Sequence, residues 1–540
     1  LKDETLVNLR PMWVINENFT LKGQVGYRLS SRARIANRET FPLTNYFTDE
    51  TTNYITAIKT PSIPQRSTYY IAMGELHYDK GFCRHNVSAV DGYSQELETV
   101  VQDETGGTRK WDDMAIMSAY AKAYYRFRDR YLAEVGIRAD GSSIFGPGQK
   151  WGYFPSVAVG WNVDKESFMR SLGFVNQFKI RASYGLLGNN NIGPYKYQAT
   201  ISNGNGAETT NANPYITWEK TRILDVGADI SLFDQKFDIT FDWFVKNVND
   251  LIITVKSSMS SGLLSTPMNV GEAEVRGFEL GFGYNHSFSK DMRLSVNVGY
   301  SYNKSKWLKM VDEEIISGNT IHKLGSAISE HYGYLTDGLL TQDDIDNRVP
   351  VWGGYDSYGD PVGQAVGDIK YIDKNDDGQI TDADRVPLGA KDPKSTFYLN
   401  LSYKYKNFDF ETLLSGVGKV PVFYTTKIAT PLNISSDGGT PQSWHLDYWT
   451  PENPDARFPR LTPSPGNNSL YSDFWEENGA FVRVRYIQLG YSFKKFAEKI
   501  GIGNIRLYLN AQNPFTFTGL KMLDPETKGS YTTHPIFKVY

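Results

Sequence analysis

The chain has 540 residues, with 57 Lys and Arg against 61 Asp and Glu, and a formal net charge of -4. This balance provides no basic footprint, so no nucleic-acid partner is expected. The single cysteine, Cys83, permits no internal disulfide. No apolar run reaches the ~18 residues of a transmembrane helix. The 14% of aromatic residues, with 35 Tyr and 48 Gly, is typical of a large β-protein with aromatic girdles.

The predicted elements are strands, recognised by residues that alternate between apolar and polar. The alternation predicts strands near residues 8–15, 19–29, 68–78, 84–94, 115–128, 130–139, 153–163, 177–186, 218–232, 236–248, 274–303 (two strands), 397–405, 408–414, 481–493 and 504–515.

The clearest alternation lies in residues 274–303, which read as two strands joined by a tight turn. One face of the second strand is formed by apolar and aromatic side chains, namely Met292, Leu294, Val296, Val298, Tyr300 and Tyr302. The residues between them are small or polar. An alternation this long suits a wall between lipid and a wet lumen better than the core of a β-sandwich.

The connections between the predicted strands alternate between short and long. Long loops are expected near residues 30–67, 187–217, 304–394 and 420–479. Outer-membrane up-and-down barrels have short turns on the periplasmic side and long loops outside. A propeller would repeat every ~40–50 residues, and a sandwich rarely needs so many long strands. The sequence therefore predicts an all-β fold, a large antiparallel transmembrane β-barrel.

Several longer motifs stand out along the chain. They are Arg138–Gly146 (RADGSSIFG), Gly152–Ser156 (GYFPS) with Trp161, Lys179–Asn189 (KIRASYGLLGN), Asn269–Glu279 (NVGEAEVRGFE), Tyr448–Pro454 (YWTPENP) with Pro459 and Arg460, Val482–Tyr491 (VRVRYIQLGY), Asn510–Phe515 (NAQNPF) and Asp524–Glu526 (DPE). These motifs resemble signatures of the SusC/RagA family of TonB-dependent outer-membrane transporters. The similarity spans essentially the whole chain, and the motifs are specific when taken together.

The resemblance implies a barrel of about 22 strands around a plug domain. Only about 16–17 strands are predicted here, with no plug or TonB box. We therefore expect residues 1–540 to be the C-terminal part of the barrel. The resemblance also implies active import of oligosaccharides, or of peptides, across the outer membrane of Bacteroidota. The implied partners are TonB, acting through the N-terminal part, and a SusD-like surface lipoprotein, in a dimer of transporter–lipoprotein pairs.

Two other functions remain open from the sequence. One is a passive porin or adhesin barrel without energy coupling. The other is a secreted β-protein that binds or cleaves glycans, which would need a carboxylate pair in a cleft to act as an enzyme. No GxSxG, HExxH, P-loop or CxxC motif occurs, so no enzymatic activity is expected.

An acidic stretch in the longest loop matches the spacing of an EF-hand-like calcium loop. Gly378 stands where such a loop turns sharply, and its oxygen ligands come from alternate positions. The candidate ligands are Asp373, Asn375, Asp377, Gln379 through its carbonyl, and Asp384. Asp384 replaces the usual Glu, which favours modest affinity. The alternative to a structural Ca²⁺ site is a solvated acidic turn.

Aromatic residues in two long loops are candidates for substrate binding, because flat rings can stack on sugar rings. The candidates are Trp352, Tyr355, Tyr358, Trp444, Tyr448 and Trp449. The alternative roles are packing within the loops and contact with a lid protein. Tyr403 and Tyr405 at a strand end suggest an interfacial girdle, and Arg138 with Asp140 suggests an ion pair where a strand enters a loop.

Overall fold

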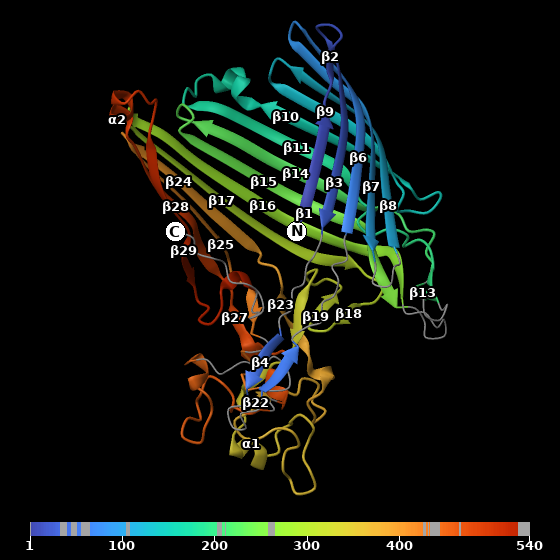
Figure 1. Ribbon diagram of the computed structural model, residues 1–540, viewed down its shortest axis with the longest axis vertical. Helices are drawn as coiled ribbons and strands as arrows, with labels where there is room; N and C mark the ends of the chain where they lie inside the picture. The colour runs from blue at the N-terminus through green and yellow to red at the C-terminus, as the bar shows by residue number, and fades with distance from the viewer. Residues whose placement is uncertain are drawn as a thin grey trace. The chain divides into compact units, whose positions relative to one another are not determined.

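The computed structural model describes residues 2–32, 40–44, 51–55, 65–103, 109–201, 208–210, 212–256, 265–424, 428–429, 431–432, 443–463 and 466–527. Its main element is a 17-stranded sheet, labelled in Figure 1. The chain divides into two compact units, residues 1–166, 180–225 and 246–272, and residues 167–179, 226–245 and 273–540.

The first unit contains an antiparallel meander: β1 and β2 both pair with β3, and from β3 to β10 each strand of the sheet pairs with the next one along the chain. Its short turns are tight: Arg128 and Asp129, between two of the strands, both have positive φ, 54° and 55°, as primed hairpin turns require. The strands are β1 (Lys2–Leu9), β2 (Met12–Val14), β3 (Phe19–Arg32), β6 (Gln65–Phe82), β7 (His85–Asp103), β8 (Arg109–Phe127), β9 (Tyr131–Ser142) and β10 (Trp151–Asn162).

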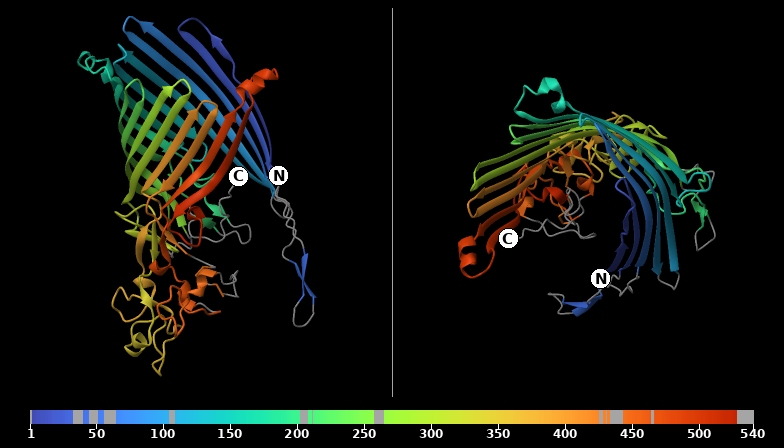
Figure 2. Two further views of the ribbon diagram at one scale, coloured as in Figure 1. Left: turned by 90° about the vertical axis from the view of Figure 1, so that its left-hand side faces the viewer. Right: turned by 90° about the horizontal axis from the view of Figure 1, so that it is seen from above.

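The second unit continues in the same manner, and Figure 2 shows its last strands side by side, coloured from yellow-green to red. They are β17 (Met292–Lys309), β24 (Ser395–Tyr405), β25 (Phe408–Val417), β28 (Phe481–Ser492) and β29 (Arg506–Thr518). Four further strands of the sheet have residues in both units, namely β11 (Val175–Asn189), β14 (Glu219–Leu232), β15 (Phe237–Lys256) and β16 (Ser265–Ser289).

Helices are short and few in the described part of the chain. Two are α-helical, α1 (Gln342–Asp346) and α2 (Lys494–Lys499). No helix there is long and apolar enough to cross a membrane. Small strand pairs lie within the connections: β4 (Thr40–Thr44) with β5 (Thr51–Ile55), and β12 (Thr200–Ile201) with β13 (Glu208–Thr210).

The two faces of the sheet differ in chemistry. Directly paired residues lie on the same face, and one such row in the first unit is Tyr78, Ala89, Ala123 and Val135. The opposite face of the same strands is polar and hydrogen-bonded: the Tyr120 hydroxyl donates to Glu75 over 2.7 Å. The predicted separation into an apolar and a polar face is therefore confirmed.

Predicted strand positions agree with the structure, but several predicted ends do not. The first predicted strand, 8–15, is wrong, because two strands, β1 and β2, pair with β3 on either side of Pro11, whose ring has no N–H to donate to a ladder. The strands also extend beyond their predicted ends: β7 reaches Asp103 and β17 reaches Lys309. Apolar residues are adjacent in these extensions, Val100 with Val101 and Trp307 with Leu308, so a strict alternation did not reveal them.

The assignment of the apolar face to lipid can be tested at Val296, which lies on the apolar face of β17 and pairs with Leu401. Arg at position 296 should lower the free energy of unfolding by about 2–4 kcal/mol if this position meets the bilayer midplane. Urea unfolding of the full-length protein in lipid vesicles, followed by tryptophan fluorescence, measures the change.

The matched control is Asn297→Arg, because Asn297 pairs with Asn400 on the polar face. Its effect should stay within about 0.5 kcal/mol, as for most surface substitutions. Equal effects of the two variants would show that the faces are assigned wrongly.

Candidate functional site

The long connections of the second unit fold together into one packed body, which we call the loop module: the described residues of 310–394, 420–479 and 519–527. Figure 1 labels several of its short elements. Its core consists of buried side chains from all three segments: Tyr334, Ile369, Tyr371, Ile380, Tyr424, Ile428, Ala429, Phe458, Trp475 and Leu520. The predicted loops at 304–394 and 420–479 are thus structured, with a hydrophobic core of their own.

Short strand pairs stiffen the loop module. β18 (Glu314–Ser317), β19 (Thr320–Lys323), β20 (Glu330–Gly333) and β23 (Val386–Ala390) form a four-stranded sheet. β21 (Thr336–Leu339) pairs with β22 (Ile369–Tyr371), and β26 (Pro421–Phe423) pairs with β27 (Glu476–Asn478). Their hydrogen bonds satisfy backbone groups that the core would otherwise leave unpaired.

A buried ion pair connects the two longest segments of the module. The Arg460 guanidinium donates to both carboxylate oxygens of Asp368, with distances of 2.6 and 3.0 Å. The side-chain amide of Asn468 donates to the same carboxylate over 2.7 Å. Asp368 is only 3% exposed, so these charge-assisted bonds compensate for the water that its carboxylate has lost.

Most of the predicted substrate-binding aromatics help to build this module. Trp352, Trp444 and Tyr448 pack against its core. The Trp449 ring covers Gly367, which has φ +86°, and a Cβ at that glycine would collide with the ring. Gly367 is therefore required both by its backbone conformation and by the close approach of Trp449.

The remaining two predicted aromatics, Tyr355 and Tyr358, lie in one loop and differ in exposure. The Tyr355 hydroxyl donates to the Val349 carbonyl over 2.8 Å, whereas Tyr358 is 91% exposed. Asp356 accepts hydrogen bonds from the backbone of Tyr358 and of Asp360, which orders the loop tip. Tyr358 is the predicted aromatic most available to a ligand or a partner, and its role stays a prediction.

The acidic loop has part of the geometry that a calcium site needs. Gly378 has φ +81°, and its N–H donates to Asp373 over 2.7 Å, so the sharp turn forms as predicted. Asp384 is buried and accepts from the backbone of Lys374 and Thr381. Burial alone would raise the pKa of Asp384, but these hydrogen bonds hold its pKa below the usual value.

The fit to Ca²⁺ is therefore partial. The Asp373, Asn375 and Asp377 side chains lie at the turn, whereas both oxygens of Asp384 are used in hydrogen bonds to the backbone. Among the residues that the structure describes, no group of three or more His, Cys, Asp and Glu is placed to hold a metal ion.

His331 is a partly buried titratable residue of the loop module, and its Nδ1 lies 2.5 Å from the Tyr471 hydroxyl. Burial, together with the nearby Lys391 ammonium, lowers the pKa of His331 to about 4. His331 is therefore neutral at physiological pH and serves as a packing group against the rings of Phe423 and Tyr471.

A second ion-pair cluster was missed from the sequence. Arg483, only 1% exposed, donates to both oxygens of Asp524 over 2.6 Å. Arg485 donates to both oxygens of Glu526 over 2.9 and 2.7 Å. Both arginines lie on β28, and both acids lie in the DPE motif. Each motif was recognised in the sequence, but no residue near either motif indicated that the arginines and the acids form ion pairs.

On the wall of the first unit, the predicted pairing of Arg138 with Asp140 is confirmed. The Arg138 Nε lies 2.7 Å from the Asp140 Oδ1, and its Nη2 donates to Ser118 over 2.7 Å. These groups lie on the polar face, paired across β8 and β9. The pair is therefore part of the polar ladder of the wall.

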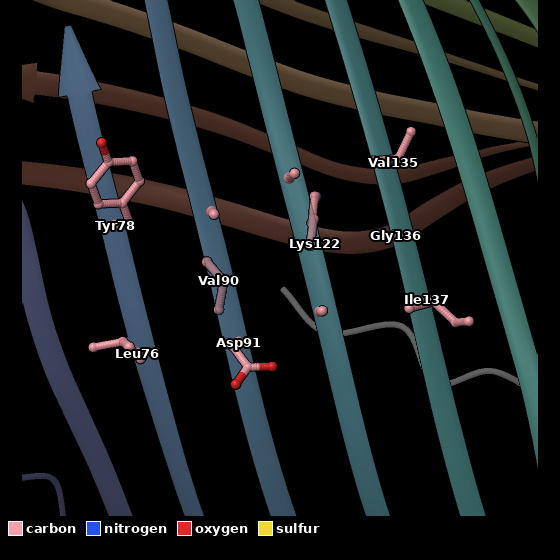
Figure 3. Close-up of a pocket in the computed structure, with 11 residues that line it drawn as sticks. Leu76, Tyr78, Val90, Asp91, Lys122, Val135, Gly136 and Ile137 are labelled. Carbon is pink, nitrogen blue, oxygen red and sulfur yellow. The ribbon is translucent and has the colours of Figure 1, made fainter.

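The apolar face of the same unit contains a shallow groove of about 440 Å³, shown in Figure 3. Small residues form its floor and larger apolar residues its edges, as expected of a surface that contacts acyl chains. Asp91, whose carboxylate is visible in Figure 3, is an acid on this face. The lining residues are Leu76, Tyr78, Ala89, Val90, Asp91, Ala121, Lys122, Ala123, Val135, Gly136 and Ile137.

Comparison with known proteins identifies this architecture. Residues 3–534 match the model of the family described as TonB dependent receptor-like, beta-barrel. TonB-dependent receptor P3 of Formosa agariphila is 29% identical over 510 residues, which cover 86% of this chain and 49% of that protein. TonB-dependent receptor SusC of Bacteroides thetaiotaomicron is 27% identical over 484 residues, covering 82% of this chain and 44% of that protein.

Among solved structures, the RagAB peptide importer in its closed-closed state superimposes with a TM-score of 0.77 at 20% identity, over 99% of this chain and 61% of that one. The outer membrane transporter YddB from Escherichia coli gives a TM-score of 0.53 at 12% identity. At such identities the likeness concerns the fold. The chain spans about half the length of the curated relatives it matches. It belongs to the TonB-dependent receptor β-barrel family, of SusC/RagA type, and its sheet is barrel wall of the bacterial outer membrane.

Proposed function

We propose that this chain forms the barrel wall of an energy-coupled importer of nutrients. The observation that carries the proposal is the family match over residues 3–534 on a sheet with one apolar and one hydrogen-bonded polar face. The apolar face would contact lipid, and the polar face would line the path of the ligand. Transport by such a wall requires no catalytic residue. Oligosaccharides are the preferred ligand class and peptides the alternative.

The proposed partners follow from the SusC/RagA resemblance. A SusD-like surface lipoprotein would cap the extracellular loops, and TonB would act through the N-terminal part of the protein, within a dimer of transporter–lipoprotein pairs. The loop module supports this proposal, because a packed body with its own core can present a defined docking surface. The exposed Tyr358 is available to the lipoprotein or to a sugar ring.

The test is uptake by cells that carry the full-length gene, its deletion, or the full-length gene without TonB. The probes are fluorescently labelled maltoheptaose and a labelled mixture of tryptic peptides. Import predicts that uptake of one probe class is lost both on deletion of the gene and on loss of TonB. Uptake that requires the gene but not TonB would instead support the passive barrel.

Rigidity of the loop module is expected to depend on Asp368. Replacing Asp368 by Ala should destabilise the module by about 2–3 kcal/mol, less than the 3–5 kcal/mol for breaking a fully buried pair, because a third of the Arg460 side chain is exposed. Hydrogen exchange of the full-length protein should show faster exchange near residues 367–371, 458–463 and 466–468.

The control for this variant is Asp337→Ala, which removes an exposed acid paired with Lys370 in the same module. It should leave exchange unchanged. If Asp368→Ala has no more effect than this control, the ion pair does not hold the two segments together.

We further propose that the acidic loop binds Ca²⁺ weakly as a structural ion. Asp373, Asn375, Asp377 and the Gln379 carbonyl would supply oxygen ligands, and Asp384 would complete the set after giving up backbone hydrogen bonds. The formed turn at Gly378 supports the proposal, whereas the engaged Asp384 carboxylate favours low affinity. Bound calcium would stiffen the loop and would take no part in chemistry.

Titration of the full-length protein with Ca²⁺, followed by calorimetry, tests this site. The expected dissociation constant lies at the weak end of calcium sites, about 10⁻⁴–10⁻³ M. Replacing Asp373 and Asp377 together by Asn should abolish the heat of binding. Asp343→Asn, on α1 in the same module, should not change it, and no heat with the unmodified protein would refute the proposal.

A further inference from the structure

The groove on the apolar face of the first unit ends close to the short turns of the sheet. Its volume is about 440 Å³, and its lining comes from β6, β7, β8 and β9. In Figure 3, Tyr78 lies nearer than Leu76 to the arrowhead of β6, so the Tyr78 end of the groove faces the turns. Ala89 and Ala123 pair directly at this end. Their small side chains leave room for a hydrocarbon chain between larger neighbours.

Lys80 is a cation on this apolar face, just beyond Tyr78 on β6. The register pairs Lys80 with Val87, next to the pair of Tyr78 and Ala89, and Lys80 is exposed. On the lipid face of a barrel a cation is least costly near the interface, where the long lysine side chain can reach the headgroups. Its place near the strand end therefore suits contact with an anionic headgroup.

Two arginines lie in the adjacent turns. The Arg128 guanidinium lies over the Phe127 ring, 5.1 Å from its centroid, and Phe127 pairs with Tyr131 on the apolar face. The Arg84 carbonyl accepts from the Arg128 N–H over 2.8 Å, which joins the two turns. We call Lys80, Arg84 and Arg128 the cationic rim.

The acids at these strand ends are engaged with other groups: Asp79 with the Ser88 hydroxyl, Asp129 with Arg126, and Glu166 with Arg130. In the part of the chain that the structure describes, no cation of the rim forms an ion pair with a carboxylate. Positive charges gathered at one edge of the sheet repel one another. An anion from outside the chain would turn this repulsion into attraction.

Exposed aromatic rings accompany the cationic rim. Phe82, Tyr125 and Tyr131, all on the apolar face, are 46%, 40% and 47% exposed. Aromatic and cationic residues together are characteristic of the interface between membrane and water, and short turns are typical of the periplasmic side. The rim therefore suits the headgroups of the periplasmic leaflet. This placement rests on the proposed function, in which the apolar face meets lipid.

Asp91 sets the direction in which an anionic ligand can lie. It pairs with Leu76 and Ala121 on the apolar face, and its carboxylate is visible in Figure 3. Along β7 it is about 13 Å from Val87, the partner of Lys80, at the usual rise of a strand. The Asp91 carboxylate would repel a phosphate, so the charged end of the ligand belongs at the rim.

We propose that the groove and the cationic rim together bind one anionic phospholipid of the periplasmic leaflet. The phosphate oxygens would accept from the Arg128 guanidinium and the Lys80 ammonium, and one acyl chain would lie over Ala123 and Ala121. The site is on the face opposite to the proposed ligand path. It is therefore independent of the transported ligand and would anchor this edge of the wall to the inner leaflet.

The first experiment tests the rim. The full-length transporter is purified in detergent with added dioleoylphosphatidylglycerol, and lipid retention is measured by native mass spectrometry. Replacing Lys80 and Arg128 together by Gln should weaken retention roughly tenfold or more, since each cation near an anionic surface contributes about fivefold. The matched control replaces Arg126 and Arg130 by Gln, which removes two charges that are already paired with acids at the same strand ends. It should leave retention nearly unchanged.

The second experiment tests the groove without changing any charge. Ala121→Phe fills the floor, whereas Ala72→Phe places the same ring on the apolar face of β6 outside the lining. Both alanines are exposed, so both variants are expected to fold, and heat-modifiable migration on gels checks this. Retention of phosphatidylglycerol should fall severalfold in Ala121→Phe alone, because the acyl chain loses its contact area.

Two results would overturn the site. One is equal retention in the rim variant and its arginine control, which would mean diffuse charge attraction. The other is loss of a dimer rather than of lipid in Ala121→Phe, which would make the groove a protein interface. Failure of the proposed function is seen separately, in uptake by cells and in the Val296→Arg variant. If those two measurements turn out as expected and lipid retention does not, only the lipid site is refuted.

Discussion

The structure depends on the need to pair every backbone N–H and C=O where no water is available. In a bilayer only closed sheets and helices can meet that need, and this chain meets it with long ladders. β6 and β7 stay in register from the Gln65–Gln102 pair to the Phe82–His85 pair. Once the ladder is fixed, side chains must alternate between two faces, so the different solvents on the two faces become visible as a two-residue pattern in the sequence.

Close packing on the polar face shows a second consequence of this constraint. Tyr120 lies across Gly92 on the neighbouring strand, and Tyr398 lies across Gly299; a Cβ at either glycine would collide with the ring. Glycine weakens a strand, and the tyrosine ring covers the exposed backbone and restores contact area. The glycines are therefore positions where a neighbouring aromatic ring needs room, and not breaks in the wall.

Local patterns were enough to predict the wall, whereas the loop module depends on distant contacts. The alternation in residues 292–302 is a property of consecutive residues, and the structure has a strand there, β17, which pairs with β24. The Asp368–Arg460 pair joins residues far apart in the chain, as does the Arg483–Asp524 pair. A buried charge and its partner have no fixed spacing in sequence, so each residue alone looked like an ordinary surface charge.

The residues of the loop module that carry the family signature differ from those that are exposed to a ligand. Tyr448, Trp449 and Arg460 belong to the signature by which the resemblance was recognised, and the structure uses all three inside the module: in the core, over Gly367 and against Asp368. They maintain the shape of the loop module. Tyr358 lies outside that signature and is exposed. Within this chain, the proposed selectivity would come from such exposed positions and from the polar face of the wall, because residues that are buried to form the scaffold cannot also contact a ligand. The sequence can therefore identify the transporter type with high specificity while containing little information about what is transported.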